Sequence, residues 1–403
     1  MHAPPVPEAP SASLYSYLHS YDVSIQPRVD QLVALLEARA PVADLRRDYA
    51  EAHHALEKSG LLALRVPQEA GGVFISQRQV IDITRQLAQA DPGVAQLLQP
   101  HYGFTDTIER LPASAQRILY RDVLNGVRIA SAASERGGKH SADFTTTLIR
   151  QGDEYIISGT KYYGTGSVGA GWITIMGLNE QGGVALAWVQ AGLPGLRVID
   201  DWNGMGQRGS SSGSVILESV RVPADFVLPV WDADHRALAW HESGRLIHAA
   251  IDLGIAEGAL RWGVEQVARD RRIPFESPFP TLASDPVLQY QIGTLSAQIF
   301  AAGALLDNAA VLLDRVQTTH PQDYPQLQSQ LAAVKALAAE VSLKASSDVF
   351  SWSGARAADR RLRIDRYWRN ARTHTLHDPV RFRYQELGQQ LLRCFSASQD
   401  DTQ

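Results

Sequence analysis

The stretch that decides the fold is residues 127–229, which opens with VRIA (127–130) and continues with TTTLIRQGDEYIIS (145–158). Its apolar residues follow a strand rhythm, as do those of the later runs at 172–177, 184–189, 195–199 and 215–222. Residues with β-branched and aromatic side chains favour strands, and QGDE (151–154) and EQGG (180–183) are typical of hairpin turns. The sequence therefore predicts a β domain in the middle of the chain.

Both flanks of this β region have helical periodicity instead. In the N-terminal part Leu32, Leu35 and Leu36 recur at helix spacing, and Asp91-Pro92-Gly93 is typical of a helix start. After the β region, apolar residues step by four and three, which indicates long helices packed side by side. We expect four bundle helices, at 247–267, 288–313, 327–345 and 356–392.

These segments together predict an α+β fold with three domains and a tail. A mobile N-terminal tail covers residues 1–20, because it is rich in Pro and Ala. The N-terminal helical domain covers 21–126, the central β domain 127–232, and the C-terminal four-helix-bundle domain 233–403.

The composition excludes several classes of protein. The chain has 403 residues, of which 45% are hydrophobic and 20% charged, and its net charge is −5, which does not suggest nucleic-acid binding. Cys394 is the single cysteine, so an intrachain disulfide or a cysteine-based metal cluster cannot form, which fits the cytoplasm. No apolar run reaches the ~20 residues that span a bilayer. The sequence also lacks a P-loop, a Gly-x-Ser-x-Gly elbow and a Rossmann glycine motif.

Two polar segments in the β region could bind a ligand. The first is SAASE (131–135) together with SAD (141–143), and the second is GTKYYGTGS (159–167). Glycine lets a backbone approach a ligand closely, hydroxyl groups bond its polar edge, and tyrosine can stack on a flat ring. On composition alone, a set of ordinary β turns is an equally good interpretation.

A third segment, RNARTHTLHDP (369–379), places His374 and His377 on nearly the same helical face, with Asp378 beside them. Pro379 would end this helix at about Asp378. A zinc site is disfavoured because the usual carboxylate–histidine spacing is absent, so we expect no metal. General acid–base catalysis and a hydrogen-bonded structural pair both remain open.

These segments resemble the acyl-CoA dehydrogenase superfamily. SAASE with SAD resembles its flavin loop, and GTKYYGTG resembles its Gly-x-Lys-x-Trp-Ile-Thr-Asn segment, with Tyr163 at the tryptophan and Thr165 at the threonine. Several ordered motifs are similar to the sulfur-acquisition oxidoreductase family, which is close to monooxygenases that oxidise dibenzothiophene and sulfones with reduced flavin. These motifs are DDWNGMGQR (200–208), SGSV (212–215), VRVPA (220–224), HAAIDLGIA (248–256) and residues 368–380, and the likeness covers nearly the whole chain after residue ~20.

The resemblance implies roles for particular residues. His377 would be catalytic at the reactive edge of the flavin, with His374 beside it and His101 across the pocket. Cofactor contacts would come from Ser131, Ser134, Tyr163, Thr165, Ser167, Arg271 and Arg372, and substrate contacts from Tyr102, Trp202 and Ser212. Ser131 stands where related monooxygenases often have Asn, and Ile273 where they often have Arg. The resemblance implies reduced FMN as the cofactor, with FAD as the alternative.

The superfamily contains both dehydrogenases and monooxygenases. A dehydrogenase needs a carboxylate base, and the matching position is Asp378, one methylene shorter than the usual Glu; a shift of about 1 Å can cost roughly 10²-fold in rate. A histidine there suits a flavin C4a-hydroperoxide instead, because imidazole can hydrogen-bond the distal oxygen. We therefore expect oxygen transfer to a small organosulfur compound. The alternatives are an acyl-CoA dehydrogenase-like oxidoreductase, an N-hydroxylating monooxygenase and a non-catalytic binding subunit.

The same resemblance implies the partners. O₂ and a small sulfide, sulfone or thiophene would be the substrates, and a separate NAD(P)H-dependent flavin reductase would supply the reduced cofactor. Bundle helices of neighbouring chains would complete the flavin site in a homotetramer. Nucleic acid and membrane are not expected as partners.

Overall fold

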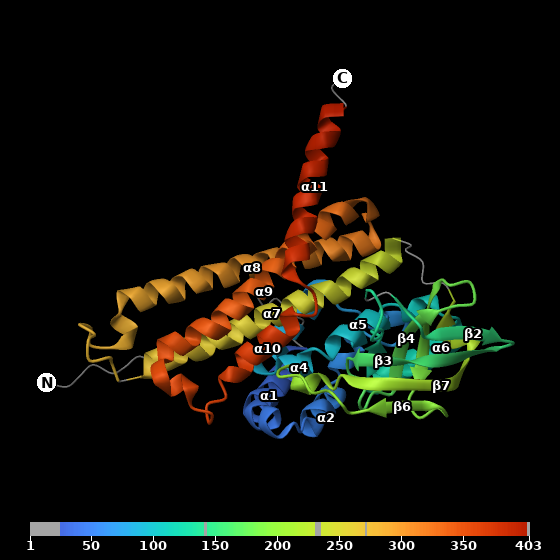
Figure 1. Ribbon diagram of the computed structural model, residues 1–403, viewed down its shortest axis with the longest axis horizontal. Helices are drawn as coiled ribbons and strands as arrows, with labels where there is room; N and C mark the ends of the chain where they lie inside the picture. The colour runs from blue at the N-terminus through green and yellow to red at the C-terminus, as the bar shows by residue number, and fades with distance from the viewer. Residues whose placement is uncertain (1–24, 141–142, 230–234, 271, 401–403) are drawn as a thin grey trace.

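The computed structural model describes residues 25–140, 143–229, 235–270 and 272–400. Within these ranges two groups of helices and a twisted sheet lie side by side, with the longest helices at one end of the molecule and the sheet at the other (Figure 1). The predicted tail at 1–20 lies outside the described residues, and the predicted boundary at 232/233 falls in the gap at 230–234. The domain boundaries therefore stay predictions.

The N-terminal part is helical, as expected. The α-helices are α1 (Gln26–Arg46), α2 (Ala50–Lys58), α3 (Gln77–Ala90), α4 (Pro92–Ala95), α5 (Leu98–Thr105) and α6 (Ala113–Leu124), joined by short turns at Leu61–Arg65, Gln68–Ala70 and Ile108–Arg110. Ser76 begins α3 with a capping box, in which its side chain accepts a hydrogen bond from the Gln79 N–H. Asp91 caps α4 by accepting hydrogen bonds from the N–H groups of Gly93 and Val94, which confirms the predicted helix start.

The sheet has eight strands: β1 (Ile129–Ala132), β2 (Thr147–Gln151), β3 (Glu154–Gly164), β4 (Trp172–Leu178), β5 (Val184–Gln190), β6 (Leu196–Ile199), β7 (Gly213–Pro223) and β8 (Val227–Leu228). Their order is β6-β7-β3-β2-β4-β5-β8, and β1 pairs in parallel with β4. The remaining neighbours pair antiparallel, apart from a single parallel contact between β2 and β4. One face buries its own apolar cluster, and the other packs Trp172 and Trp188 against α5 and α6.

Strand β3 is longer than the sequence indicated. It runs on from Ser158 through Gly164, so most of the glycine-rich segment GTKYYGTGS is strand and not a series of turns. Its pairing with β7 is interrupted between Lys161 and Gly164, where a bulge turns Tyr163 into the left-handed region at φ 56°. Because a bulge re-aims a side chain, the polar segment ends in an exposed aromatic ring.

The C-terminal part contains α7 (His235–Arg269), α8 (Pro286–Thr318), α9 (Tyr324–Ser353), α10 (Asp365–Thr375) and α11 (Val380–Asp400). The first three match the predicted bundle helices. The fourth, expected over 356–392, is two helices, α10 and α11. They are separated at Pro379, where the sequence predicted a helix end, because the ring and the missing N–H of proline interrupt a helix. Helix α11 then projects away from the rest of the molecule (Figure 1).

Helix α8 leaves much of its apolar surface uncovered. It is the one described helix that is long and apolar enough to cross a bilayer, and 44% of its most apolar 18-residue window is buried. Core helices of other proteins meet the same test, and α8 packs along both α7 and α9. Val287 and Tyr290 near its start and Val311 near its end remain exposed.

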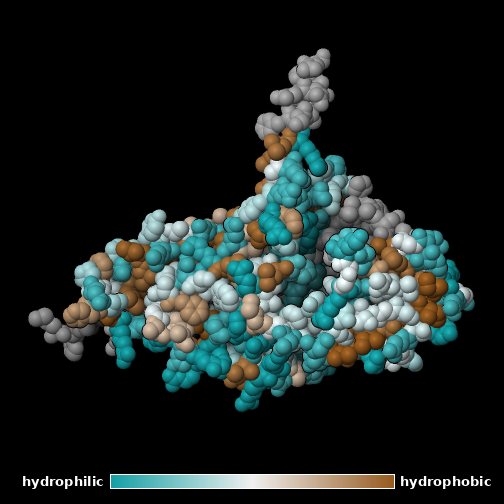
Figure 2. All heavy atoms as spheres, in the orientation of Figure 1, coloured by the Kyte–Doolittle hydropathy of each residue, from teal (hydrophilic) through white to brown (hydrophobic). Residues whose placement is uncertain are grey.

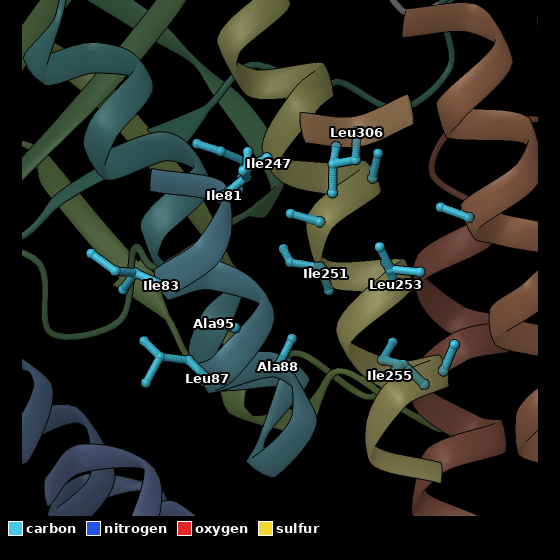
Figure 3. Close-up of a cluster of buried hydrophobic side chains, with 14 of the residues drawn as sticks. Ile81, Ile83, Leu87, Ala88, Ala95, Ile247, Ile251, Leu253, Ile255 and Leu306 are labelled. Carbon is cyan, nitrogen blue, oxygen red and sulfur yellow. The ribbon is translucent and has the colours of Figure 1, made fainter. Parts of the chain in front are cut away.

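The helical parts meet where α3 crosses α7 (Figure 3). Ile81 and Ala88 of α3 lie toward Ile247 and Ile251 of α7 in a fully buried cluster. Gly254 and Gly258 of α7 lie one turn apart, and a Cβ on them would come within 2.5 Å of Arg85 O and 2.6 Å of Gln89 O. The two backbones can approach this closely only because both positions are glycine.

His101 of α5 ties the N-terminal helices to the sheet. Its Nε2 donates to Leu62 O at 2.8 Å, and its Nδ1 accepts from the Ile129 N–H at 3.0 Å. Tyr102 donates its hydroxyl to Leu61 O at 2.6 Å, and both side chains are fully buried. These bonds use both ring nitrogens of His101 and the hydroxyl hydrogen of Tyr102. The structure therefore contradicts the predicted catalytic role of His101 and the predicted substrate contact of Tyr102.

We predict that Gly254→Ala destabilises the protein by about 1–3 kcal/mol, because the added methyl group must push two helix backbones apart. Urea unfolding followed by tryptophan fluorescence measures this change. Gly293→Ala in α8 is the matched control: its Cβ would meet nothing within 4 Å, so this variant should gain up to about 1 kcal/mol from helix propensity. Equal stabilities of the two variants would contradict the close helix crossing.

We also predict a pH-dependent stability that arises from His101. Burial lowers the pKa of His101 to about 4, assisted by Arg128 and opposed by the bond to Leu62 O. An unfolded histidine has a pKa of about 6.5, so on acidification the unfolded chain takes up this proton first. The contribution is complete above about pH 6.5 and is lost as the pH falls toward 4, at a cost of about 3 kcal/mol.

The measurement is the urea midpoint between about pH 7 and 4. It should fall more steeply for the wild type than for His101→Gln, whose side chain does not titrate. His140→Gln, which changes an exposed histidine, should keep the wild-type slope. A wild-type slope in His101→Gln would contradict the assignment.

Candidate functional site

A cavity of about 480 Å³ lies between the β domain and the C-terminal helices. The wall formed by the β domain consists of Ser131, Ala133, Ser134, Tyr163, Thr165 and Met176. The wall formed by the C-terminal helices consists of Gly244, Arg245, His248, Lys335, His377, Asp378 and Arg383. The remaining lining residues are Gln99 and Phe104 of α5. It lies at the foot of α11, where the molecular surface is hollowed (Figure 2). The cavity brings together five of the thirteen predicted site residues, although they come from distant parts of the sequence: Ser131, Ser134, Tyr163, Thr165 and His377.

The β-domain wall offers hydroxyl groups that the protein itself does not use. Ser131 and Thr165 lie side by side, because Ser131 N donates to Thr165 O at 3.2 Å in an isolated antiparallel bridge. Within the described residues, the side chains of Ser131, Ser134 and Thr165 make no hydrogen bond to another residue. Since polar groups near a protein interior usually find partners, these three are suited to the polar edge of a ligand.

Tyr163 stands out on this wall. Its backbone is left-handed, a conformation that costs a non-glycine residue of order 1 kcal/mol and that clusters at ligand sites. The ring is 55% exposed, meets Trp202 edge-on at 6.1 Å, and lies 5.5 Å from the Arg136 guanidinium. The strained bulge therefore holds an aromatic face open toward the cavity.

A buried ion pair shapes the loop behind these hydroxyls. Lys161 Nζ donates to Glu135 Oε1 at 2.5 Å and to Ala133 O at 3.1 Å. The Glu135 carboxylate also accepts hydrogen bonds from the backbone N–H groups of Thr145 and Thr146. Burial would raise the pKa of Glu135, but the hydrogen bonds from Lys161 and from the two threonines outweigh it and lower the pKa to about 2. Lys161 and Glu135 thus fix the segment that presents Ser131 and Ser134.

On the helical wall, His377 faces this surface from the end of α10. Its ring stacks on His248 of α7, with centroids 4.4 Å apart and planes at 29°. The surrounding protein, then the neighbouring His374 and Lys335, lower the pKa of His377. The side chain still reaches solvent, so it is desolvated only in part. The ring is therefore neutral near pH 7, with one nitrogen that donates and one that accepts.

Behind this pair lies a buried polar network. His374 Nδ1 is 2.5 Å from Asp252 Oδ1, and Lys335 Nζ is 2.5 Å from Asp252 Oδ2. His374 Nε2 lies 3.0 Å from His248 Nδ1 and 3.1 Å from Gln96 Oε1. Burial raises the pKa of Asp252, but His374 and Lys335 together overcome this effect and hold the pKa below its usual value. His374 itself does not line the cavity; it contacts the cavity residue His248.

The two predicted substrate residues lie in a second cavity. Trp202 and Ser212 line a recess of about 300 Å³, together with Arg136 and Tyr163. Trp202 Nε1 donates to Gln207 O at 2.9 Å, and the Ser212 hydroxyl pairs with that of Ser210 at 2.7 Å. Tyr163 lines both cavities, so the second recess adjoins the first.

A larger recess, of about 860 Å³, lies between α2 and the β domain. Its basic groups are already paired within the protein: Arg128 with Glu57 at 2.8 Å, and Arg208 with Asp44 O at 2.8 Å. Its size alone does not make it a ligand site. The unpartnered hydroxyls and the strained tyrosine point to the cavity of 480 Å³ instead.

Other predicted residues do not reach this cavity. Ser167 is buried, and its hydroxyl has no hydrogen-bond partner among the described residues. Arg372 is half-buried on α10 and is not part of the cavity wall. Arg271 lies outside the described residues, so its contact with a flavin phosphate stays a prediction. Among the described residues, no cluster of three or more His, Cys, Asp or Glu could hold a metal ion.

Several cavity residues were missed by the sequence reasoning. Gln99, Phe104, Met176, Arg245 and Lys335 carry no motif that separates them from ordinary helix or strand residues. His248 and Asp252 had a usable signal: they are four residues apart within HAAIDLGIA, so a helix places a histidine and a carboxylate on one face of an otherwise apolar segment. A carboxylate on a buried apolar face requires partners.

The first cavity suits a flavin ring. Its volume lies within the ~300–1,000 Å³ typical of small-molecule sites. One wall offers three unused hydroxyls and an aromatic ring, which match the polar edge and the flat face of an isoalloxazine. The opposite wall brings an imidazole to the same space. The residues present therefore fit the cofactor that the sequence resemblance implies.

Comparisons with known proteins identify the family of this chain. Two family models match the chain: the acyl-CoA dehydrogenase middle domain over residues 130–220 and the acyl-CoA dehydrogenase C-terminal domain over residues 246–382. A dibenzothiophene monooxygenase of Rhodococcus qingshengii is 31% identical over 355 residues, which cover 84% of this chain and 85% of that protein. A probable FMNH2-dependent monooxygenase, SfnC, of Pseudomonas putida is 29% identical, covering 83% of this chain and 86% of that protein.

A solved structure gives the same result in three dimensions. FMN-bound TdsC from Paenibacillus sp. A11-2 superposes with a TM-score of 0.87 at 26% identity, covering 92% of this chain and 97% of that chain. The predicted fold class and family are confirmed. The chain belongs to the acyl-CoA dehydrogenase family, as a homologue of the dibenzothiophene monooxygenases.

Proposed function

We propose that this protein is a reduced-flavin-dependent monooxygenase that transfers one oxygen atom of O₂ to a small organosulfur compound of the sulfide, sulfone or thiophene type. The cofactor is reduced FMN, with FAD as the alternative. The names of the relatives support this choice: they include dibenzothiophene monooxygenases, a probable FMNH2-dependent monooxygenase and an FMN-bound structure.

One observation carries the proposal. A cavity opens between three unused hydroxyls with a strained tyrosine on one side and a neutral, solvent-reaching histidine, His377, on the other. Ser131, Ser134 and Thr165 would bond the polar edge of the flavin, and Tyr163 would contact its ring. Reduced flavin, when bound, supplies the electrons that activate O₂ and carries the oxygen atom to be transferred.

His377 then controls the proton at this site. A neutral imidazole can donate a hydrogen bond with one nitrogen and accept one with the other, so it can hold a proton near a reacting oxygen without becoming charged. Phe104 and Met176 add apolar surface to the same cavity and help to exclude water, which limits wasteful release of hydrogen peroxide.

The electrons come from a separate NAD(P)H-dependent flavin reductase. The sequence contains no Gly-x-Gly-x-x-Gly motif after a strand, which is the usual binding site for a nicotinamide dinucleotide. Reduced FMN therefore arrives by diffusion, and the protein should purify with little bound flavin. With a single cysteine, the enzyme is suited to the cytoplasm, where reduced flavin is made.

An acyl-CoA dehydrogenase-like oxidoreductase is the runner-up, because Asp378 also lines the cavity. Its carboxylate is engaged by Arg383, with Oδ1 3.2 Å from the guanidinium Nε, and Arg383 also contacts Glu386. A base that abstracts a carbon-bound proton needs a lone pair directed at the substrate. The Asp378–Arg383 pair makes Asp378 poorly suited to that task.

We predict that His377→Ala uncouples the enzyme. With FMNH2, O₂ and a sulfide or sulfone, the variant should form oxygenated product about 10²-fold more slowly and release hydrogen peroxide instead, because the proton at the site is no longer held. Binding of FMNH2 should change by less than about threefold, since the hydroxyls and Tyr163 remain. Peroxide and product yields per O₂ consumed measure the coupling.

His320→Ala is the matched control, because it removes a histidine at the far end of α8 and should leave coupling at the wild-type level. Preserved coupling in His377→Ala would refute the role of His377. Bleaching of tightly bound flavin by an acyl-CoA, without O₂ consumption, would favour the dehydrogenase instead.

We further propose that the protein assembles as a homotetramer through α8. The apolar residues along its exposed side, including Tyr290 at 73% exposure, form a surface that water solvates poorly. Bundle helices of a neighbouring chain would cover this surface, in keeping with the large apolar interfaces of obligate oligomers.

We predict that the double variant Tyr290→Glu, Val311→Glu forms smaller oligomers, because each new glutamate would place an unpaired charge in the proposed interface. Sedimentation velocity should show tetramers for the wild type and smaller species for the variant. Leu45→Glu is the control: it places the same charge on a half-exposed leucine of α1 and should remain tetrameric. An unchanged tetramer in the α8 variant would place the interface elsewhere.

A further inference from the structure

We propose that Asp252, His374 and His248 form a buried proton relay that decides whether His248 donates or accepts a hydrogen bond at the cavity wall. The inference rests on the proposed function, because it treats the 480 Å³ cavity as the reaction site. His248 lines this cavity, whereas His374 and Asp252 lie behind it as positioning residues. The relay moves only a proton and requires no oxidant or reductant.

The first link fixes one tautomer. The Asp252 carboxylate is fully buried, and each of its oxygens has a partner: Lys335 Nζ on one and His374 Nδ1 on the other, both at 2.5 Å. A carboxylate between two cationic or donating groups can only accept. The Nδ1 nitrogen of His374 therefore carries a hydrogen, and the state of its Nε2 becomes the variable.

The second link passes that variable to His248. His374 Nε2 lies 3.0 Å from His248 Nδ1, so one hydrogen occupies the space between them. When the pair is neutral, His248 Nδ1–H donates to His374 Nε2, and His248 Nε2 carries a lone pair. When the pair holds one extra proton, His374 Nε2–H donates to His248 Nδ1, and His248 Nε2 carries the hydrogen. One proton thus converts His248 Nε2 from acceptor to donor.

Gln96 supports both states from the N-terminal helices. Its amide lies 3.1 Å from His374 Nε2, through the atom assigned as Oε1. In that orientation it accepts from the protonated ring, and with the amide turned over it donates to the neutral ring. Because the Gln96 amide is neutral, it does not compete with the two histidines for the proton, whereas a carboxylate at this position would attract it.

The charges around the relay favour a single shared proton. From α9, Lys335 offsets the charge of Asp252; from α7, Arg245 is paired with Glu242 at 2.9 Å. From the foot of α11, Arg383 is paired with Asp378 and Glu386. The His377 ring is stacked 4.4 Å from that of His248. A positive charge on the relay therefore disfavours a second positive charge on His377 and keeps His377 neutral. The relay therefore supports the state in which His377 acts.

The first test uses the flavin-free protein labelled with ¹⁵N-histidine. Solid-state ¹⁵N spectra distinguish protonated from unprotonated ring nitrogens, and His374→Gln and His248→Gln assign the two rings by difference. In the wild type, the nitrogens of His248 and His374 should change together over one pH interval. Changes in separate pH intervals would overturn the relay, and this measurement needs no folded variant beyond those used for assignment.

The second test is functional. His374→Gln can still donate to Asp252 but cannot pass a proton, so coupling of O₂ consumption to product should fall by about tenfold or more and lose its pH dependence. Binding of FMNH2 should stay within about twofold of the wild type. His53→Gln is the matched control: it changes a half-buried histidine, bonded to Gly209 O at 2.8 Å and remote from the relay, and should keep the wild-type pH profile.

The outcomes separate the relay from the function. The relay would be overturned if coupling in His374→Gln kept the wild-type pH profile. It would also be overturned if the ¹⁵N signals of His248 were the same in His374→Gln as in the wild type. A wild type that forms no oxygenated product from any sulfide or sulfone would overturn the proposed function alone, because the coupled ¹⁵N response of the two rings would still stand.

Discussion

The buried carboxylate of Asp252 is the constraint on which the arrangement of the helical wall depends. An unpaired carboxylate in this position would cost several kcal/mol, so Lys335 of α9 and His374 of α10 must both approach α7. These contacts set the end of α10, and with it the position at which His377 stacks on His248. On a neighbouring face of α7, the glycines at 254 and 258 receive α3. One helix therefore carries both the main packing contact and the support of the site.

The β domain also buries a charged side chain and pairs it within the protein. Lys161, also buried, satisfies its charge with Glu135, and Glu135 in turn gathers the backbone of Thr145 and Thr146. The polar segment that sequence analysis singled out thus contains two kinds of residue. Lys161 and Glu135 fold the segment, while the hydroxyls of Ser131, Ser134 and Thr165 are left unused by the protein. Such division is expected where a ligand completes the hydrogen bonds of a wall.

Sequence patterns predicted the order of the helical and β regions, most strand positions, and the β-domain wall, because strand rhythm and glycine-rich motifs are local signals. They also singled out His377, which lies near a proline that breaks the helix and which the structure places in the cavity wall. They failed for His101, since nothing local reveals that both ring nitrogens bond backbone from other elements. They missed Lys335 for a similar reason: a lysine on a helix is expected to be solvated, and the sequence does not show that the fold places Asp252 beside it.

Tyr163 has a consequence for the size of molecule that the protein admits. Its ring belongs to the walls of both the 480 Å³ chamber and the 300 Å³ chamber, and its left-handed backbone limits where that ring can point. A single side chain is thus the partition between two compartments. A compound that extended from one cavity into the other would therefore have to pass this ring.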